Sequence, residues 1–122
     1  MRELLTIQKQ NRLNTVYAAD EQENGGQNHT YLIFCGESDH EVEHVALLQF
    51  QKGPRNEEDS VSGIIDTDLL EIVRDRLIGF QQSEYAVRDN DIALMHIETA
   101  LMWLNKRVED RAARDVLGTS EK

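Results

Sequence analysis

Three arginines lie close together near the C-terminal end of the chain. Arg107, Arg111 and Arg114 follow one another at steps of four and three residues. On a helix these steps place the three side chains within about 60° of one another, with Trp103 one turn earlier on the same face. A guanidinium offers two parallel N–H donors that match the oxygens of a phosphate. The spacing therefore predicts a site for a small anion.

Two carboxylates lie among these arginines and favour a plainer alternative. Asp110 stands three residues after Arg107 and four before Arg114, so both pairs could form surface ion pairs worth a few tenths of a kcal/mol each. Cations near the end of a helix also complement its dipole. A second hypothesis is a purely structural oligomer, in which the arginines only pair with Glu109 and Asp110 across chains.

A five-residue segment matches a zinc-protease motif. His40-Glu41-Val42-Glu43-His44 has the form H-E-x-x-H, in which two histidines one helical turn apart share a zinc ion and the glutamate acts as base. Residues 42–50 alternate in polarity with a period of two, which predicts a strand instead. On a strand His40 and His44 lie about 13 Å apart and cannot share a metal. We expect no metal, and a small zinc-dependent hydrolase remains the alternative function.

The composition limits the class of ligand. The chain has 122 residues, with 23 acidic and 13 basic residues and a formal net charge of -10. Binding of a nucleic acid polymer needs a broad basic surface, whereas a small anion needs only a few converging cations. No apolar run approaches the ~20 residues that span a bilayer, and the N-terminal residues lack the apolar region of a signal peptide. The composition favours a small anionic ligand, without nucleic acid or membrane.

The reactive residues do not form a recognisable catalytic set. The single cysteine, Cys35, excludes an internal disulfide, and its apolar neighbours in YLIFC predict a buried structural thiol in a reducing cytoplasm. No glycine-rich phosphate loop, Cys-x-x-Cys pair or G-x-S-x-G motif is present. We therefore expect a ligand-binding protein without catalytic residues or cofactor.

The chain reads as a single α+β domain, with a β-rich half over about residues 1–65. Three strands are predicted to form an antiparallel meander, over residues 12–19, 29–36 and 41–51. The loop 52–60 contains the only proline, and Val61–Ile65 could form one further short strand.

A helical hairpin is predicted over about residues 66–117. The apolar residues Leu69, Val73, Leu77 and Phe80 recur at helical spacing, with Thr67 as the N-cap of this first helix. The second helix would be capped by Asp89 or Asn90 and stopped by Gly118. Two long helices joined by a short loop form an αα-hairpin.

The C-terminal residues resemble a known family. The resemblance rests on Ala100-Leu101-Met102-Trp103-Leu104-Asn105-Lys106-Arg107, then Asp110, Arg111, Arg114, Val116 and Gly118-Thr119. This stretch is similar to the phage Thoeris anti-defence proteins of the first type. That family shares its αα-hairpin with the phage anti-CBASS cyclic-nucleotide sponges, and the order of strands before hairpin agrees with it.

The resemblance implies a function without catalysis. Such proteins act in the host bacterial cytoplasm as sponges, which bind cyclic ADP-ribose isomers made by TIR-domain immune enzymes and hold them uncleaved. The Thoeris effector is then not activated. Relatives form dimers and hexamers, and some also bind cyclic di- or trinucleotides. We therefore expect a homo-oligomer whose ligand is a cyclic ADP-ribose-type nucleotide.

The resemblance also implies particular ligand contacts, at Phe80, Asn90, Arg107 and Arg111. An aromatic ring at Phe80 can stack on a base, and the Asn90 amide can bond a base edge or a ribose hydroxyl. The arginines would hold the pyrophosphate. The plainer alternatives are that Phe80 extends the apolar stripe of the first helix and that Asn90 is an N-cap.

The spacing of these contacts has a consequence for the oligomer. Asn90 and Arg107 are about 26 Å apart on one helix at ~1.5 Å per residue, too far for one small ligand to reach both. Antiparallel packing of two chains would bring the ends together, so we expect the site at a dimer interface.

Two further positions bear on the resemblance. Arg55, an exposed cation in the KGPR loop, is a candidate for a second nucleotide pocket where more chains meet. Asp115 departs from the family pattern, in which a small residue or glycine is common, and this leaves the end of the second helix open.

Overall fold

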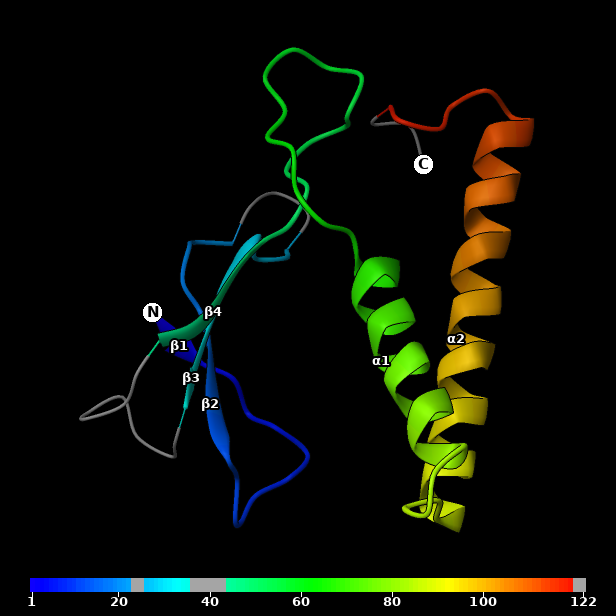
Figure 1. The fold of residues 1–122 in the computed structure, drawn as a ribbon. Helices are drawn as coiled ribbons and strands as arrows, with labels where there is room; N and C mark the ends of the chain where they lie inside the picture. The colour runs from blue at the N-terminus through cyan, green and yellow to red at the C-terminus, as the bar shows by residue number, and fades with distance from the viewer. Residues whose placement is uncertain (23–25, 36–43, 120–122) are drawn as a thin grey trace. The chain divides into compact units, whose positions relative to one another are not determined.

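A computed structural model describes residues 1–22, 26–35 and 44–119. It divides the chain into two compact units, Met1–Lys52 and Gly53–Lys122, and each is described here on its own. The first contains a sheet and the second a pair of helices (Figure 1). The predicted α+β class is confirmed.

The first unit is an antiparallel meander. Its sheet has the order β1-β2-β3-β4, and every neighbouring pair is antiparallel. The strands are β1 (Arg2–Glu3), β2 (Asn14–Ala18), β3 (Thr30–Cys35) and β4 (His44–Gln49). The last three fall within the predicted ranges, whereas β1 was not predicted. The further strand expected at Val61–Ile65 is not formed in the part of the chain that the structure describes.

Aromatic pairs and a few buried residues hold the sheet. Tyr17 packs edge-to-face on Phe34 with ring centroids 5.7 Å apart, and Tyr31 does so on Phe50 at 5.5 Å. Thr15 in β2 is fully buried. Alternation along β2 explains this burial, because Thr15 and Tyr17 point to the same face.

The prediction for Cys35 was wrong. It is exposed rather than buried. Cys35 is the last residue of β3 and pairs with Asn14, the first residue of β2, at the end of the sheet. Apolar neighbours in sequence therefore did not imply neighbours in space.

A carboxylate joins the end of β2 to the start of β3. Asp20 accepts hydrogen bonds from the backbone N–H of His29 (3.0 Å) and of Thr30 (3.2 Å), and from Nδ2 of Asn28 (3.2 Å). Burial raises the pKa of Asp20, but the hydrogen bonds from Thr30, His29 and Asn28 outweigh it, so the pKa is lowered from its usual 3.8. Arg2 in β1 donates to Oδ1 of Asn28 at 2.7 Å, which extends this network to a third strand.

The second unit is the predicted αα-hairpin. Helix α1 (Asp66–Gln81) and helix α2 (Arg88–Ala113) lie side by side and run in opposite directions (Figure 1). Nε of Arg74 donates to Oε2 of Glu98 at 2.8 Å and so joins the two helices. At the loop, Nε2 of Gln81 donates to the Val87 carbonyl and to Oδ1 of Asp91, both at 2.8 Å.

Both helices begin earlier than predicted. Thr67 is not the first N-cap: the cap is Ile65, whose backbone N–H donates to Oδ2 of Asp68 at 2.9 Å. Asn90 and Asp89 are not the second N-cap either, because α2 begins at Arg88 after the extended residue Val87. The carboxamide of Gln81 accepts from Val87 N–H at 3.2 Å, which replaces a local side-chain cap.

Helix α2 ends before Gly118, contrary to the prediction. The Val116 N–H donates to the Arg111 carbonyl at 3.0 Å, and the Asp115 N–H donates to the Ala112 carbonyl at 3.1 Å. This is a Schellman motif, whose turning residue adopts a left-handed conformation. That residue is Asp115, with φ 58°. Glycine adopts this conformation without steric cost, so a glycine would fit this position better than aspartate does.

The hairpin leaves much apolar surface exposed. No described residue of α1 or α2 is buried. The exposed large apolar residues of the two helices are Ile72, Val73, Phe80, Met95, Met102, Trp103 and Val108. Neither helix, as far as the structure describes the chain, has the length and apolarity of a membrane span.

We predict that Asp20→Asn destabilises the sheet by about 1–3 kcal/mol near neutral pH, since amide N–H groups would lose a charged acceptor. A folded pKa below 3.8 means that Asp20 contributes stability above this pH and that the contribution is lost as the pH falls through the folded pKa. Melting followed by circular dichroism at several pH values would measure this. Asp59→Asn is the control, and an equal acid dependence of wild type and Asp20→Asn would contradict the assignment.

We predict that Asp115→Gly raises the stability of the second unit by about 1 kcal/mol, because it relieves the left-handed backbone. Chemical denaturation would measure the gain. Glu109→Gly, inside α2, should instead lower the stability by about 1 kcal/mol, because glycine disfavours the helix. A loss of stability in Asp115→Gly would mean that the Asp115 side chain stabilises the turn.

Candidate anion site at the end of the hairpin

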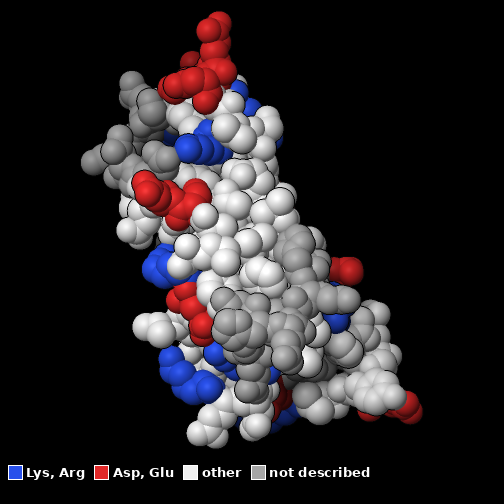
Figure 2. Space-filling model, turned by 90° about the vertical axis from the view of Figure 1, so that its left-hand side faces the viewer, with Lys and Arg blue, Asp and Glu red and all other residues white. Residues whose placement is uncertain are grey.

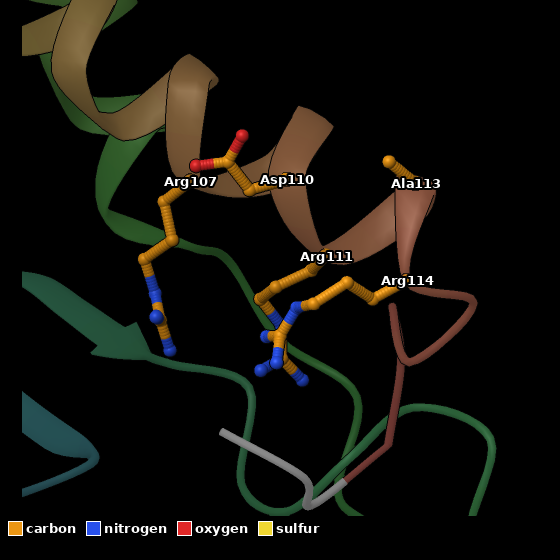
Figure 3. Close-up of a pocket in the computed structure, with 5 residues that line it drawn as sticks. All are labelled: Arg107, Asp110, Arg111, Ala113 and Arg114. Atoms are coloured by element: carbon orange, nitrogen blue, oxygen red, sulfur yellow. The ribbon is translucent and has the colours of Figure 1, made fainter.

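The three arginines come together as predicted from their spacing. Arg107, Arg111 and Arg114 line an open hollow of about 640 Å³ with Asp110 and Ala113. In Figure 3 the arginine side chains extend from the same side of the C-terminal end of α2. The Asp110 carboxylate points the other way. An anion in this hollow would meet guanidinium groups.

The neighbouring carboxylates have other partners. Asp110 pairs with Nζ of Lys106 at 3.1 Å, and Glu109 accepts from Nδ2 of Asn105 at 3.2 Å. The predicted pair between Arg107 and Asp110 was therefore wrong, and Arg107 forms no ion pair within residues 1–22, 26–35 and 44–119. Lys106 competes for Asp110 from the i–4 position, which is a favourable helical spacing.

Arg111 is held in place by the turn that follows α2. Its Nη2 donates to the carbonyl of Val116 at 3.1 Å and to the carbonyl of Thr119 at 3.0 Å. The Arg111 side chain is half-buried, whereas Arg107 and Arg114 are exposed. A guanidinium that is already oriented loses less conformational entropy when it binds a ligand.

The loop that contains Arg55 contacts this same turn. Nη2 of Arg55 donates to the Gly63 carbonyl at 3.2 Å, and the Asn56 N–H donates to the Gly118 carbonyl at 3.3 Å. Arg55 thus belongs to a loop that adjoins the arginine end of the hairpin. Its role in a second nucleotide pocket stays a prediction.

The other predicted contacts are spread along the hairpin. Phe80 lies in the last turn of α1 and is 42% exposed, with Cζ of Arg76 5.7 Å from its ring centroid. Asn90 lies half-buried in the first turn of α2, and Trp103 is 68% exposed on that helix. Phe80 and Asn90 therefore flank the hairpin loop. Along α2, Asn90 lies about 26 Å from Arg107 at ~1.5 Å per residue. Within one chain the structure does not bring these residues to the arginines.

Two contacts near the candidate site were not predicted from the sequence: that of Arg76 with Phe80 and that of Asn56 with Gly118. Arg76 stands four residues before Phe80, a spacing that could have indicated contact. The contact between Asn56 and Gly118 joins residues far apart in sequence, and no local pattern indicates it.

A second hollow on the hairpin is less suited to an anion. It measures about 710 Å³ and is lined by Thr67, Glu71, Arg74, Glu98, Leu101, Met102, Asn105 and Val108. Two of these residues are acidic, and Arg74 already bonds Glu98. The face in Figure 2 likewise carries basic and acidic side chains interspersed, without one broad basic area. The arginine hollow is thus the better candidate for an anion.

The zinc motif lies largely outside the described residues. His40 to Glu43 are not described, and His44 begins strand β4. Among the described residues no group of three or more potential metal ligands occurs.

We predict that Asp110→Asn increases the affinity for inorganic pyrophosphate roughly two- to fivefold, because one negative charge beside the hollow is removed. Titration calorimetry at low salt would measure the change. Asp75→Asn, at an exposed position in the middle of α1, removes an equal charge and should leave the affinity unaltered. Weaker binding by Asp110→Asn would show that this carboxylate supports the site.

Comparison with known proteins identifies the family. Residues 44–109 match the model of the family described as "Acb2/Tad1, hairpin domain". The chain is 45% identical over 78 residues to "Thoeris anti-defense 1" of Bacillus phage SBSphiJ7, which covers 64% of this chain and 54% of that protein. The chain thus spans about half the length of this curated relative.

The family match includes α1 and most of α2. Arg107 falls within the matched residues, and Arg111 and Arg114 follow directly after them. The match covers more than half of the chain, so this protein belongs to the Acb2/Tad1 hairpin-domain family, as the C-terminal resemblance predicted.

Proposed function

We propose that this protein binds a cyclic ADP-ribose-type signalling nucleotide and holds it without cleaving it. It would thereby act in the host bacterial cytoplasm as a phage anti-defence protein against Thoeris immunity. The observation that carries the proposal is the group of arginines on one side of α2, whose neighbouring carboxylate is paired with Lys106. The name of the relative, "Thoeris anti-defense 1", supports the biological role.

The chemistry of the hollow fits a pyrophosphate. Two adjacent phosphates carry several oxygens over a short distance, and bidentate guanidinium groups satisfy them with charge-assisted hydrogen bonds. The cations are few and local, which suits a small nucleotide better than a polymer. Cyclic di- or trinucleotides carry separate phosphodiester groups in place of a pyrophosphate. Guanidinium groups can bind these phosphates too, so such nucleotides are a second class of ligand for this surface.

The base would be recognised at the other end of the hairpin. In the proposed site Phe80 stacks on the base, Asn90 bonds the base edge or a ribose hydroxyl, and Trp103 borders the arginine end. Because about 26 Å separates Asn90 from Arg107, these groups come from two chains packed in antiparallel orientation. The exposed apolar residues of the hairpin support such an oligomer, since their burial against a second copy is favourable.

We predict that Arg107→Ala weakens binding of cyclic ADP-ribose isomers roughly 10- to 100-fold, because a phosphate oxygen loses a charged donor. Its unfolding should change little, since the side chain is exposed. Titration calorimetry with a panel of isomers would measure this, with Lys9→Ala as a control that removes one exposed positive charge. Equal affinity of Arg107→Ala and wild type would exclude Arg107 from the site.

The shared site has its own test. Phe80→Ala chains and Arg107→Ala chains should each bind poorly, but unfolding and refolding them together should restore about a quarter of the sites, since half of the dimers are mixed and each mixed dimer has one intact site. Stoichiometry from calorimetry would count them. No recovery on mixing would mean that the site lies within one chain.

A further inference from the structure

The turn after α2 is tied to two parts of the second unit. Residues 114–119, here called the C-terminal turn, bend back from α2 toward the loop 53–60 (Figure 1). The carbonyls of Val116 and Thr119 accept hydrogen bonds from Nη2 of Arg111, which joins the turn to α2. The Gly118 carbonyl accepts from the Asn56 N–H at 3.3 Å, which joins the turn to the loop.

Gly118 is the point at which the turn meets the loop. Its φ is +81°, in the left-handed region. A Cβ atom added there would lie 2.6 Å from Nδ2 and 3.1 Å from Cγ of Asn56. A side chain at this position would therefore strain the backbone and also displace the Asn56 carboxamide.

The turn is closed by Thr119. Its Oγ1 donates to the Val116 carbonyl at 2.5 Å, and its backbone N–H donates to the same oxygen at 3.1 Å. Gly118 thus lies within the turn between Val116 and Thr119, which supply both carbonyl oxygens that Arg111 contacts. The orientation of the Arg111 guanidinium depends on this turn.

We propose that Gly118, seated against Asn56, is a positioning residue for ligand binding, because it holds the C-terminal turn that orients Arg111 toward the hollow. The inference rests on the proposed function, since it assigns Arg111 to the phosphate. The turn therefore holds the guanidinium in the orientation in which Arg111 lines the hollow.

Gly118→Ala is the direct test. We expect it to weaken binding of a cyclic ADP-ribose isomer and of inorganic pyrophosphate roughly tenfold, with unchanged helical content. Gly26→Ala is the matched control: Gly26 also has a left-handed φ, of +85°, and an added Cβ there meets nothing within 4 Å. That control should bind as wild type does.

A double-mutant cycle separates positioning from a general loss of structure. In an Arg111→Ala background Gly118→Ala should cause no further loss of affinity, because its effect acts through Arg111. An equal loss in both backgrounds would overturn the proposal. So would unchanged affinity of Gly118→Ala in the protein that retains Arg111.

A measurement on the ligand-free protein tests the orientation of Arg111 separately from the proposed function. The Nε–H NMR signal of Arg111 should be dispersed in wild type and averaged in Gly118→Ala. If wild type binds neither nucleotide nor pyrophosphate, the proposed function fails and the role in ligand binding fails with it. If wild type binds and Gly118→Ala binds equally well, only the positioning role is wrong.

Discussion

The left-handed turn at Asp115 is the constraint on which the candidate site depends. It ends α2 at Ala113 and directs the chain back, so that the carbonyls of Val116 and Thr119 reach the Arg111 guanidinium. If α2 continued to Gly118, these carbonyls would lie along the helix axis and would not meet the Arg111 side chain. The end of the helix therefore determines which arginine is fixed and which are exposed.

Local pairing explains how an acidic protein can present a cationic hollow. The net charge of -10 is spread over the whole chain, whereas the potential at the hollow depends on charges within a Debye length of about 10 Å. The two carboxylates between Arg107 and Arg111 have other partners: Asp110 bonds Lys106 and Glu109 bonds Asn105. The proposed ligand, a small dianion, therefore meets arginines beside which Asp110 and Glu109 are bonded to other residues.

Much of the fold could be predicted from sequence, because periodicity reports which residues share a face. The three main strands and both helices of the hairpin follow from alternation and from the three- and four-residue steps of the apolar residues. The caps could not be predicted in this way. Gln81 substitutes for a cap at the start of α2 through a contact across the loop, and Asp115 occupies a position where glycine is expected.

The site was predictable to the same extent. The steps between Arg107, Arg111 and Arg114 correctly placed them on one side of α2. The ion pairs beside the arginines were not predictable, because the spacing allows Asp110 to pair with Lys106 or with an arginine. The contact of Asn56 with Gly118 depends on how a loop meets the turn, and spacing along the chain carries no information about it.

In the proposed function the protein holds its ligand and does not convert it. This is tested by saturating the purified protein with a cyclic ADP-ribose isomer, denaturing it by heat and identifying the released nucleotide by chromatography. Intact cyclic nucleotide is expected, released in proportion to the bound sites. A linear or hydrolysed product would contradict it, and would return attention to the His40–His44 motif as a hydrolytic centre.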